Sequence, residues 1–135
     1  MSVEENKALI RFFFEASVDE VLAKVDELMA PDFVYHTLEG DLDREAYKQI
    51  NLAVLAAFPD LQYTLDDLIV EGDKSAARWT MTGTHQAEFN GIPATNKTIA
   101  LTGVSVDRIK DGKFIETWMF YDSMSMLAQL GVMPQ

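Results

Sequence analysis

Apolar residues recur at helical spacing in the first part of the chain. Ser2 and Glu5 have the S-x-x-E spacing of a capping box, and the apolar positions after them lie three or four residues apart. The segment Ser17–Glu20 gives the same start signal for a second helix, which we expect to stop at Pro31. A third apolar pattern of this period ends at Pro59. The apolar positions are Leu9, Ile10, Phe13 and Phe14, then Val21, Leu22, Val25, Leu28 and Met29, then Ala46, Tyr47, Ile50, Val54, Leu55 and Phe58.

From Leu61 onward the apolar period becomes two, which is typical of strands. Two hairpins are predicted, with turns at 71–74 and 110–113, and Gly131 is a fitting stop for a last short helix. The predicted strands are 33–36, 63–70, 76–85, 98–108 and 114–121, and residues 38–42 are expected to form a loop. Helices first and antiparallel strands later predict one α+β domain over residues 1–135. A strongly twisted sheet wrapped around a helix encloses a pocket that suits small apolar molecules.

Side-chain alternation sorts the strand residues into faces. Trp79, Met81, Gly83 and His85 share one mainly apolar face, so His85 is expected to point inward. His36 stands on an apolar strand in the same way. Each histidine has a functional interpretation, as a hydrogen-bond donor to a developing oxyanion, and a structural one, as a hydrogen-bonded core residue.

Asp122 is the main candidate for chemistry, because it stands where the last strand runs into the last helix. Alternation places it on one side with Glu116, Trp118 and Phe120. A carboxyl group against aromatic walls is poorly solvated, which favours its protonated form and makes it a good proton shuttle near neutrality. The alternative is structural: Asp122 is a common N-cap residue for the helix after it.

Composition narrows the possible partners. The formal charge of -11 argues against nucleic acid and anionic membranes, because phosphate would be repelled. The chain has no cysteine, so disulfides, thiolate nucleophiles and cysteine-bound metals are excluded. No apolar run approaches the roughly 18 residues of a membrane span, and the first ten residues do not have the form of a leader, so we expect a soluble, cytoplasmic protein.

Three runs of sequence, in this order and spacing, resemble the SnoaL-like polyketide cyclase family. They are GTHQAEFNGIPATNK (83–97), LTGVSVDRIKDGKFIETW (101–118) and YDSMSMLAQLG (121–131), and the similarity extends over nearly the whole chain. The resemblance implies the nuclear transport factor 2-like fold, a cone-shaped α+β barrel with a curved, mostly antiparallel sheet. Departures from the family pattern lie in loops, at residues 16–19 and around Thr95. They bear on substrate fit more than on fold.

The resemblance also implies a chemistry. In characterised cyclases of this family an aspartate at the end of the last long strand is the general acid/base of a cofactor-free intramolecular aldol ring closure, and Asp122 matches that position. The family's histidines match His36 and His85. No cofactor and no metal are expected, since three scattered ligands without local spacing are a weak metal signal. The aromatic residues expected to bind a small apolar or aromatic substrate are Phe14, Tyr35, Phe58, Trp79, Trp118 and Phe120.

Three functional classes therefore stay open. The first is a cofactor-independent cyclase, a lyase, and the second is another small-molecule enzyme on the same fold, such as an isomerase, hydrolase or hydroxylase. The third is a non-catalytic module that binds a small ligand. We also expect a homodimer or a higher homo-oligomer, because alternation leaves an apolar face opposite the expected pocket. That face would carry Ile99, Leu101, Met119 and Tyr121.

Overall fold

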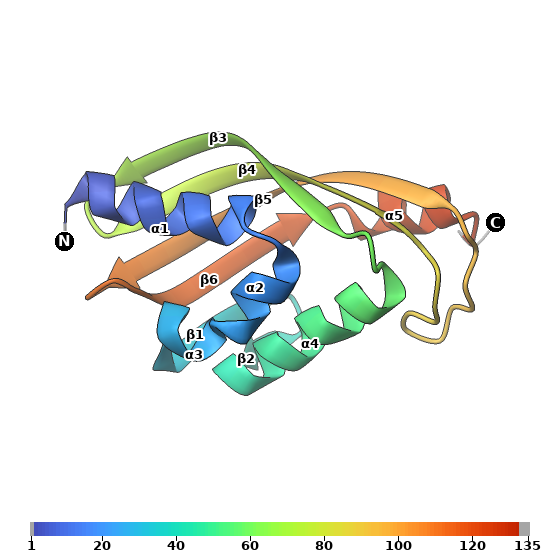
Figure 1. Cartoon of the computed structure of the whole chain (residues 1–135), viewed down its shortest axis with the longest axis horizontal. Helices are drawn as coiled ribbons and strands as arrows, with labels where there is room; N and C mark the ends of the chain where they lie inside the picture. Colours follow the sequence, from blue (N-terminus) through green and yellow to red (C-terminus); the bar gives the residue numbers. More distant parts are fainter. Residues whose placement is uncertain (1, 133–135) are drawn as a thin grey trace.

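The computed structural model describes residues 2–132. These form one six-stranded sheet and five helices (Figure 1). The elements in chain order are α1 (Val3–Glu15), α2 (Val18–Ala23), α3 (Val25–Leu28), β1 (Met29–Thr37), β2 (Gly40–Leu42), α4 (Arg44–Ala57), β3 (Gln62–Glu71), β4 (Lys74–Thr84), β5 (Thr98–Lys110), β6 (Lys113–Tyr121) and α5 (Ser123–Leu130). None of the described helices is long and apolar enough to cross a membrane.

The helices begin at the residues that the capping pattern predicts. The side chain of Ser2 accepts a hydrogen bond from the amide of Glu5 in a complete capping box. The side chains of Ser17 and Asp43 cap α2 and α4 by a single bond each, accepted from the backbone amide three residues later. The second predicted helix is divided into α2 and α3 at Lys24, which leaves the helical conformation. Pro31 does not end a helix but lies within β1.

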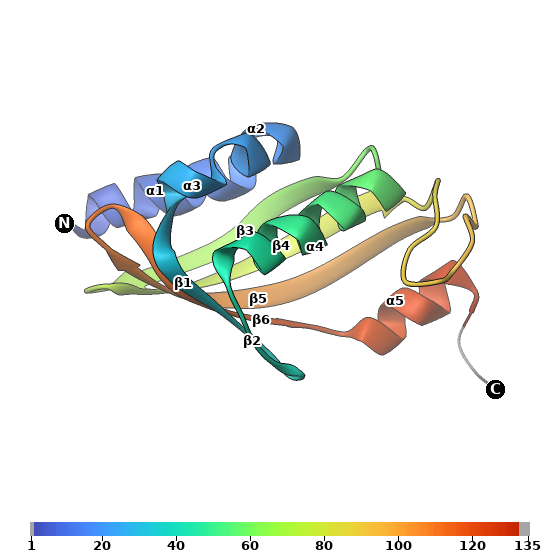
Figure 2. The same cartoon turned by 90° about the horizontal axis from the view of Figure 1, so that it is seen from below.

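The six strands form a single sheet in the order β2-β1-β6-β5-β4-β3. Only β1 and β6 run parallel, and all other neighbours are antiparallel. The sheet is strongly curved, and Figure 2 shows α1 to α4 on one side of it, with α5 at the end of β6. Residues 40–42 were expected to be loop but pair with β1 instead, which adds an edge strand. The α+β class predicted from the element order is confirmed.

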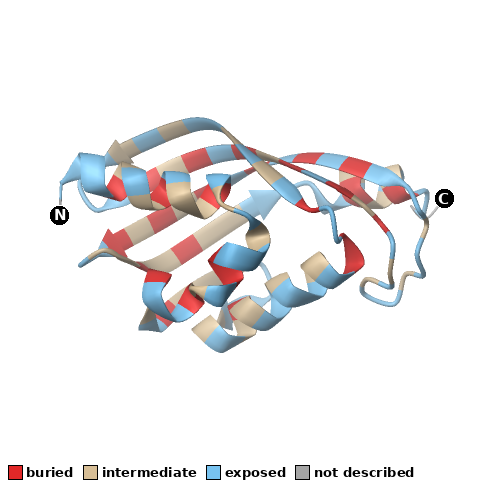
Figure 3. Ribbon diagram, viewed as in Figure 1, coloured by how far each residue is buried: buried red, intermediate tan, exposed pale blue. Residues whose placement is uncertain are grey.

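Buried and exposed residues alternate along the central strands, as Figure 3 shows for β4 and β5. Trp79 and Met81 are buried against the helices, and His85 is fully buried just beyond the end of β4, as alternation predicts. The covered, concave face of the sheet and the helices above it therefore share one core.

Strand β6 contains an irregularity that decides which of its faces points inward. Ile109 pairs with Phe114, but the next residue of β5, Arg108, pairs with Glu116, so Ile115 is an extra residue in the ladder. Such a β-bulge reverses the facing of every residue after it. The pairing of β1 with β6 shifts at the same level, between Met29 and Val34, and bulges tolerate a proline such as Pro31.

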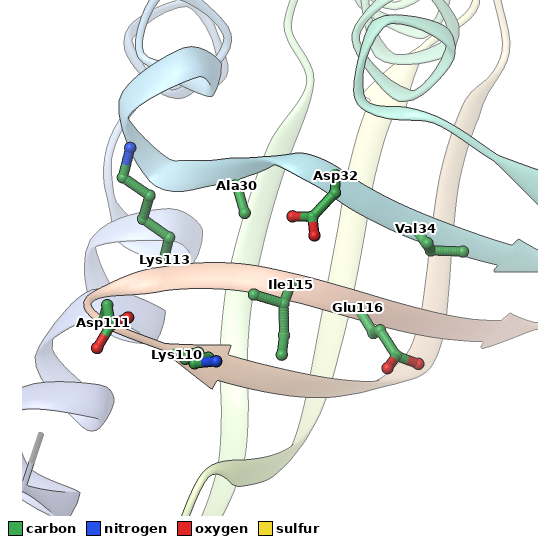
Figure 4. A pocket seen from close by; sticks show the side chains of 8 residues that line it. All are labelled: Ala30, Asp32, Val34, Lys110, Asp111, Lys113, Ile115 and Glu116. Atoms are coloured by element: carbon green, nitrogen blue, oxygen red, sulfur yellow. The ribbon is translucent and has the colours of Figure 1, made fainter.

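An open groove lies on the sheet beside the bulge at Ile115. It has a volume of about 470 Å³ and is bounded by β1 and the β5–β6 hairpin (Figure 4). Its lining residues are Ala30, Asp32, Val34, Lys110, Asp111, Lys113, Ile115 and Glu116. Charged side chains of both signs and the apolar side chains of Ala30, Val34 and Ile115 line this groove together, so its surface is mixed.

Candidate functional site

An apolar cavity of about 80 Å³ lies between α4 and the concave face of the sheet. Tyr35 reaches it from β1, Trp79 from β4, and Met119 and Tyr121 from β6. Val54 closes it from α4. We call this space the outer chamber. Its walls are mostly aromatic and thioether side chains, which suit a small apolar ring.

A second, smaller space of about 10 Å³ lies deeper in the core, between α1, α4 and the sheet. Phe14 and Tyr47 line it from the helices, and Asp107 and Thr117 line it from β5 and β6. We call it the inner chamber. Its volume is about that needed for one water molecule. Among the described residues Met119 alone lines both chambers, so its side chain lies on their shared boundary.

Asp107 is the one acidic residue that the described structure buries in this core, at 4% exposure. The hydroxyl of Thr117 donates a hydrogen bond to its carboxyl group over 2.6 Å, and the hydroxyl of Ser75 donates a longer one over 3.5 Å. Burial raises the pKa of Asp107 to about 7, although these two hydrogen bonds act in the opposite direction. Near neutral pH this carboxyl group therefore exists in both protonation states.

Three tyrosines surround the two chambers. Burial raises the pKa of Tyr35 to about 12 and also raises the pKa values of Tyr47 and Tyr63 well above their ordinary value, so all three phenols stay protonated and are available as donors. Tyr35 packs edge-to-face on Tyr47 at 5.0 Å between ring centres, and Tyr63 packs in the same way on Trp79 at 5.5 Å. The rings fix the shape of the chamber walls.

Asp122 has surroundings different from those predicted. Its side chain accepts a hydrogen bond from the amide of Ser125 over 3.0 Å and caps α5, and the residue is exposed. The aromatic walls expected beside it were predicted on the wrong face. Because of the bulge at Ile115, Trp118 and Phe120 point away from the chambers, and Phe120 is 53% exposed. Neither residue lines the outer chamber, whereas Met119 and Tyr121 do.

His36 lies on the outer face of the sheet rather than in a chamber. Its imidazole stacks on Trp118 with 4.5 Å between ring centres, and its two nitrogens lie 2.7 Å from Asp41 and 2.9 Å from Glu116. Burial by itself would lower the pKa of His36, but the hydrogen bonds to Glu116 and Asp41 and the charges of these carboxylates outweigh it, so the pKa is raised. Glu116 also accepts a hydrogen bond from Arg108 over 3.0 Å.

His85 is part of the core beside the long loop that follows β4. The backbone amide of Thr95 donates a hydrogen bond to its Nδ1 over 3.2 Å, and the hydroxyl of Thr95 lies 3.0 Å from the same nitrogen. The ring stacks on Phe58, at 5.3 Å between centres. Neither His85 nor Phe58 lines the outer chamber, and both are packed in the core instead. The three predicted catalytic residues, Asp122, His36 and His85, are therefore not brought together.

Of the six predicted substrate-binding residues, Tyr35 and Trp79 line the outer chamber and Phe14 lines the inner one. Sequence reasoning missed Asp107, although a signal for it exists. Leu101, Gly103, Ser105, Asp107 and Ile109 alternate along β5 on its buried face. An acidic residue on such a face is rarely buried without a partner or a function.

Among residues 2–132 no group of three or more histidine, aspartate or glutamate side chains is arranged to hold a metal ion. The residues that could act in the chambers are thus one carboxyl group and several neutral hydroxyl donors. Such a set is suited to proton transfer on an apolar molecule.

The chain is similar over almost its full length to several solved structures. AclR from Streptomyces galilaeus, named as a candidate hydroxylase, is 31% identical, with 98% of this chain and 100% of that chain covered and a TM-score of 0.89. IdmH from Streptomyces antibioticus, named as a candidate polyketide cyclase, is 34% identical, with 93% and 98% covered and a TM-score of 0.80. TsrD from Streptomyces laurentii is 26% identical, with 98% and 99% covered and a TM-score of 0.87.

A comparison with curated protein sequences gave no significant match. The sequence model of the SnoaL-like polyketide cyclases, in contrast, matches residues 7–130, which include both chambers and Asp107. The curved sheet with its helices on one face agrees with the structures of such proteins. The chain therefore belongs to the SnoaL-like polyketide cyclase family.

Proposed function

We propose that this protein closes a ring in a small apolar carbonyl compound by cofactor-free acid/base chemistry, with Asp107 as the proton-transfer group. The observation that carries the proposal is the buried carboxyl group of Asp107, which has a pKa of about 7 and lies next to an aromatic chamber. A general acid/base works best when its pKa is near the working pH, because both of its forms are then available. Membership of the family supports ring closure as the reaction.

An intramolecular aldol reaction needs two proton transfers. In the first, the carboxylate of Asp107 takes a proton from a carbon next to a carbonyl group, which leaves an enolate. The enolate carbon then attacks a second carbonyl carbon of the same molecule, and the new carbon–carbon bond leaves an alkoxide. The carboxyl group of Asp107 returns the proton to that oxygen, so the enzyme ends in its starting state.

The tyrosines supply the complementary groups. Tyr47 lines the inner chamber with Asp107, and Tyr35 lines the outer chamber. Their phenols keep their protons at neutral pH, so they can donate hydrogen bonds to an enolate or alkoxide oxygen. Such donors act more strongly in a site of low dielectric constant than in water.

Hydroxylation is a second candidate, because AclR, 31% identical, is named as a candidate hydroxylase. The same carboxyl group could form the enolate on which an oxidant then acts. Mass spectrometry of the product separates the two reactions. An aldol product keeps the atoms of the substrate, or loses water, whereas a hydroxylated product gains one oxygen atom.

A homodimer is also proposed, on a face different from the one predicted. On the face expected to be uncovered, Ile99 and Leu101 are buried in the core and Met119 is half-buried, and Tyr121 alone of the four is exposed, at 48%. The opposite face carries exposed apolar side chains, including Val104 at 37% and Phe120 at 53% exposure. A second copy is the proposed cover. Light scattering at micromolar concentration should give twice the chain mass of 15.2 kDa, and a monomer mass would contradict the proposal.

The proposed function is tested by a screen of aromatic β-keto esters and open-chain polycarbonyl compounds. A ring-closed product formed by the unmodified protein and lost in Asp107→Asn would support it. If a substrate is converted equally well by Asp107→Asn, the assignment of Asp107 fails.

A further inference from the structure

Met119 is the one described residue whose side chain lines both chambers, and it therefore lies on the boundary between them. It contributes to the lining of the outer chamber and of the inner chamber, whereas Asp107 contributes to the inner one alone. A substrate held by the aromatic walls of the outer chamber therefore meets the Met119 thioether before it meets the carboxyl group.

The inner face of β6 sets out this arrangement along a line. Thr117 donates its hydrogen bond to Asp107, Met119 lies between the chambers, and Tyr121 lines the outer chamber. Successive residues on one face of a strand are about 7 Å apart. Met119 is therefore the residue of this face that follows Thr117, the partner of Asp107, and precedes Tyr121 of the outer chamber.

Met119 is held in this position by a weak interaction. The hydroxyl of Tyr35 donates a hydrogen bond to its Sδ over 3.5 Å, and the residue is only half-buried. A thioether is a weak acceptor, and methionine is unbranched with three rotatable bonds. The side chain can turn aside without movement of the backbone of β6.

We propose that Met119 is the specificity-determining gate of this site, which admits a narrow, flexible carbonyl chain to Asp107 and excludes a rigid ring. This inference rests on the proposed function of Asp107. When the thioether turns aside, the two chambers join into one channel whose inner end is wide enough for about one water-sized group. The reacting end of the substrate is therefore an open chain, and its bulkier apolar part stays in the outer chamber.

The gate can be tested without any substrate, by the titration of the Asp107 carboxyl carbon in NMR spectra, assigned by comparison with Asp107→Asn. Met119→Ala should admit water to the inner chamber and lower the pKa of Asp107 toward its ordinary value, since burial is the main cause of the shift. Met119→Leu, a matched variant that keeps an apolar side chain between the chambers, should titrate as the unmodified protein does. Equal titration in Met119→Ala and Met119→Leu would overturn the gate.

A kinetic measurement gives an independent test. Met119→Phe should lower kcat/KM for an open-chain substrate at least about tenfold while Asp107 still titrates near its original pKa, because the ring closes the passage without touching the carboxyl group. Turnover by Met119→Phe equal to that of the unmodified protein would overturn the gate. The two hypotheses fail in different ways: full activity of Asp107→Asn removes the function of Asp107, whereas an inactive Asp107→Asn together with unaffected Met119 variants removes only the gate.

Discussion

The hydroxyl of Thr117 donates a hydrogen bond to the carboxyl group of Asp107 across the β5–β6 ladder, over 2.6 Å. The two residues are direct cross-strand partners, and both are buried. This bond stabilises the carboxylate, so it limits the rise in pKa that burial causes. It also fixes the direction in which the carboxyl group faces the inner chamber.

Replacement of Thr117 should therefore change the titration of Asp107. Thr117→Val keeps the shape of the side chain but removes the donor, so the pKa of Asp107 should rise above about 7. The acid limb of a pH–rate profile should move to higher pH by the same amount. Thr117→Ser is the control, because it keeps the hydroxyl group. A Thr117→Val protein in which Asp107 titrates unchanged would show that this bond has no influence.

Asp107 should also make the stability of the protein depend on pH. Its pKa is raised from the ordinary value of 3.8 to about 7, so between these values the folded protein holds a proton that the unfolded chain releases. The unfolded state then binds fewer protons, and the free energy of unfolding falls as pH rises through this range. Above pH 7 the folded protein must bury a charged carboxylate.

Asp107→Asn removes that contribution. The difference in unfolding free energy between the variant and the unmodified protein, measured with denaturant from pH 4 to pH 8, should increase in favour of the variant as pH rises, on the order of a few kcal/mol in total. All other titrating groups are common to both proteins and cancel in the difference. A difference that is constant with pH would contradict a raised pKa for Asp107.

The raised pKa of His36 gives a further prediction about pH, which concerns the outer face of the sheet. Because Glu116 and Asp41 outweigh the effect of burial, the protonated ring stabilises the fold below the ordinary pKa of 6.5, and this contribution is lost as pH rises through the folded-state pKa. NMR titration of the ring protons should show a lower pKa for His36 in Glu116→Gln than in the unmodified protein. The chain has only two histidines, so His36→Gln identifies the signal.

If Glu116→Gln leaves the titration of His36 unchanged, the ion pair at 2.9 Å between His36 and Glu116 does not contribute to the pKa of His36 in solution. His36→Gln itself should leave turnover nearly unaffected, because the ring lies outside both chambers. A large loss of activity in His36→Gln would restore the catalytic role that the family resemblance implies for this residue.

Gly103 shapes the wall of the outer chamber by having no side chain. A Cβ atom at this position would overlap the six-membered ring of Trp79 and would lie 2.8 Å from the backbone oxygen of Phe120. Gly103→Ala should therefore destabilise the protein by about 1–3 kcal/mol, as overpacking of a core does. Gly83→Ala is a milder comparison, because its Cβ would meet Phe58 at 3.1 Å. Equal melting temperatures for the two variants would contradict this account of the wall.

Much of the fold follows from sequence patterns, as the inward face of β4 illustrates. Trp79, Met81 and His85 alternate with polar residues, so the buried face is unambiguous, and the structure confirms it. The helix starts at Ser2 and Ser17 could be predicted for a similar reason, since capping is a local interaction.

Strand β6 shows where such reasoning fails. Both of its faces carry large apolar residues, Trp118 and Phe120 on one and Met119 and Tyr121 on the other. Hydrophobicity therefore does not show which face points into the core. A regular hairpin through the turn at 111–112 would place Trp118 on the inner side, and the bulge at Ile115 reverses this. A bulge depends on how two strands pair, and the alternation of a single strand does not contain it.

The candidate site inherits this difficulty. Asp122 was predicted in the pocket beside Trp118 and Phe120, but the bulge turns that face of β6 outward, and Asp122 caps α5. Asp107 could have been found, since it interrupts the apolar face of β5, but its importance depends on Thr117, which meets it only through the shifted register.

The most direct test of Asp107 as the proton-transfer group compares the turnover of one substrate by Asp107→Asn and by Asp122→Asn. Both changes replace a carboxyl group by an amide of the same shape, and asparagine is itself a good N-cap, so α5 should survive the second change. We predict that Asp107→Asn loses about 10²- to 10⁴-fold in kcat, as expected for a general acid/base, while Asp122→Asn retains most of its activity. Retention of more than about a tenth of the activity by Asp107→Asn, with a large loss in Asp122→Asn, would contradict the account and return the chemistry to the exposed aspartate at the start of α5.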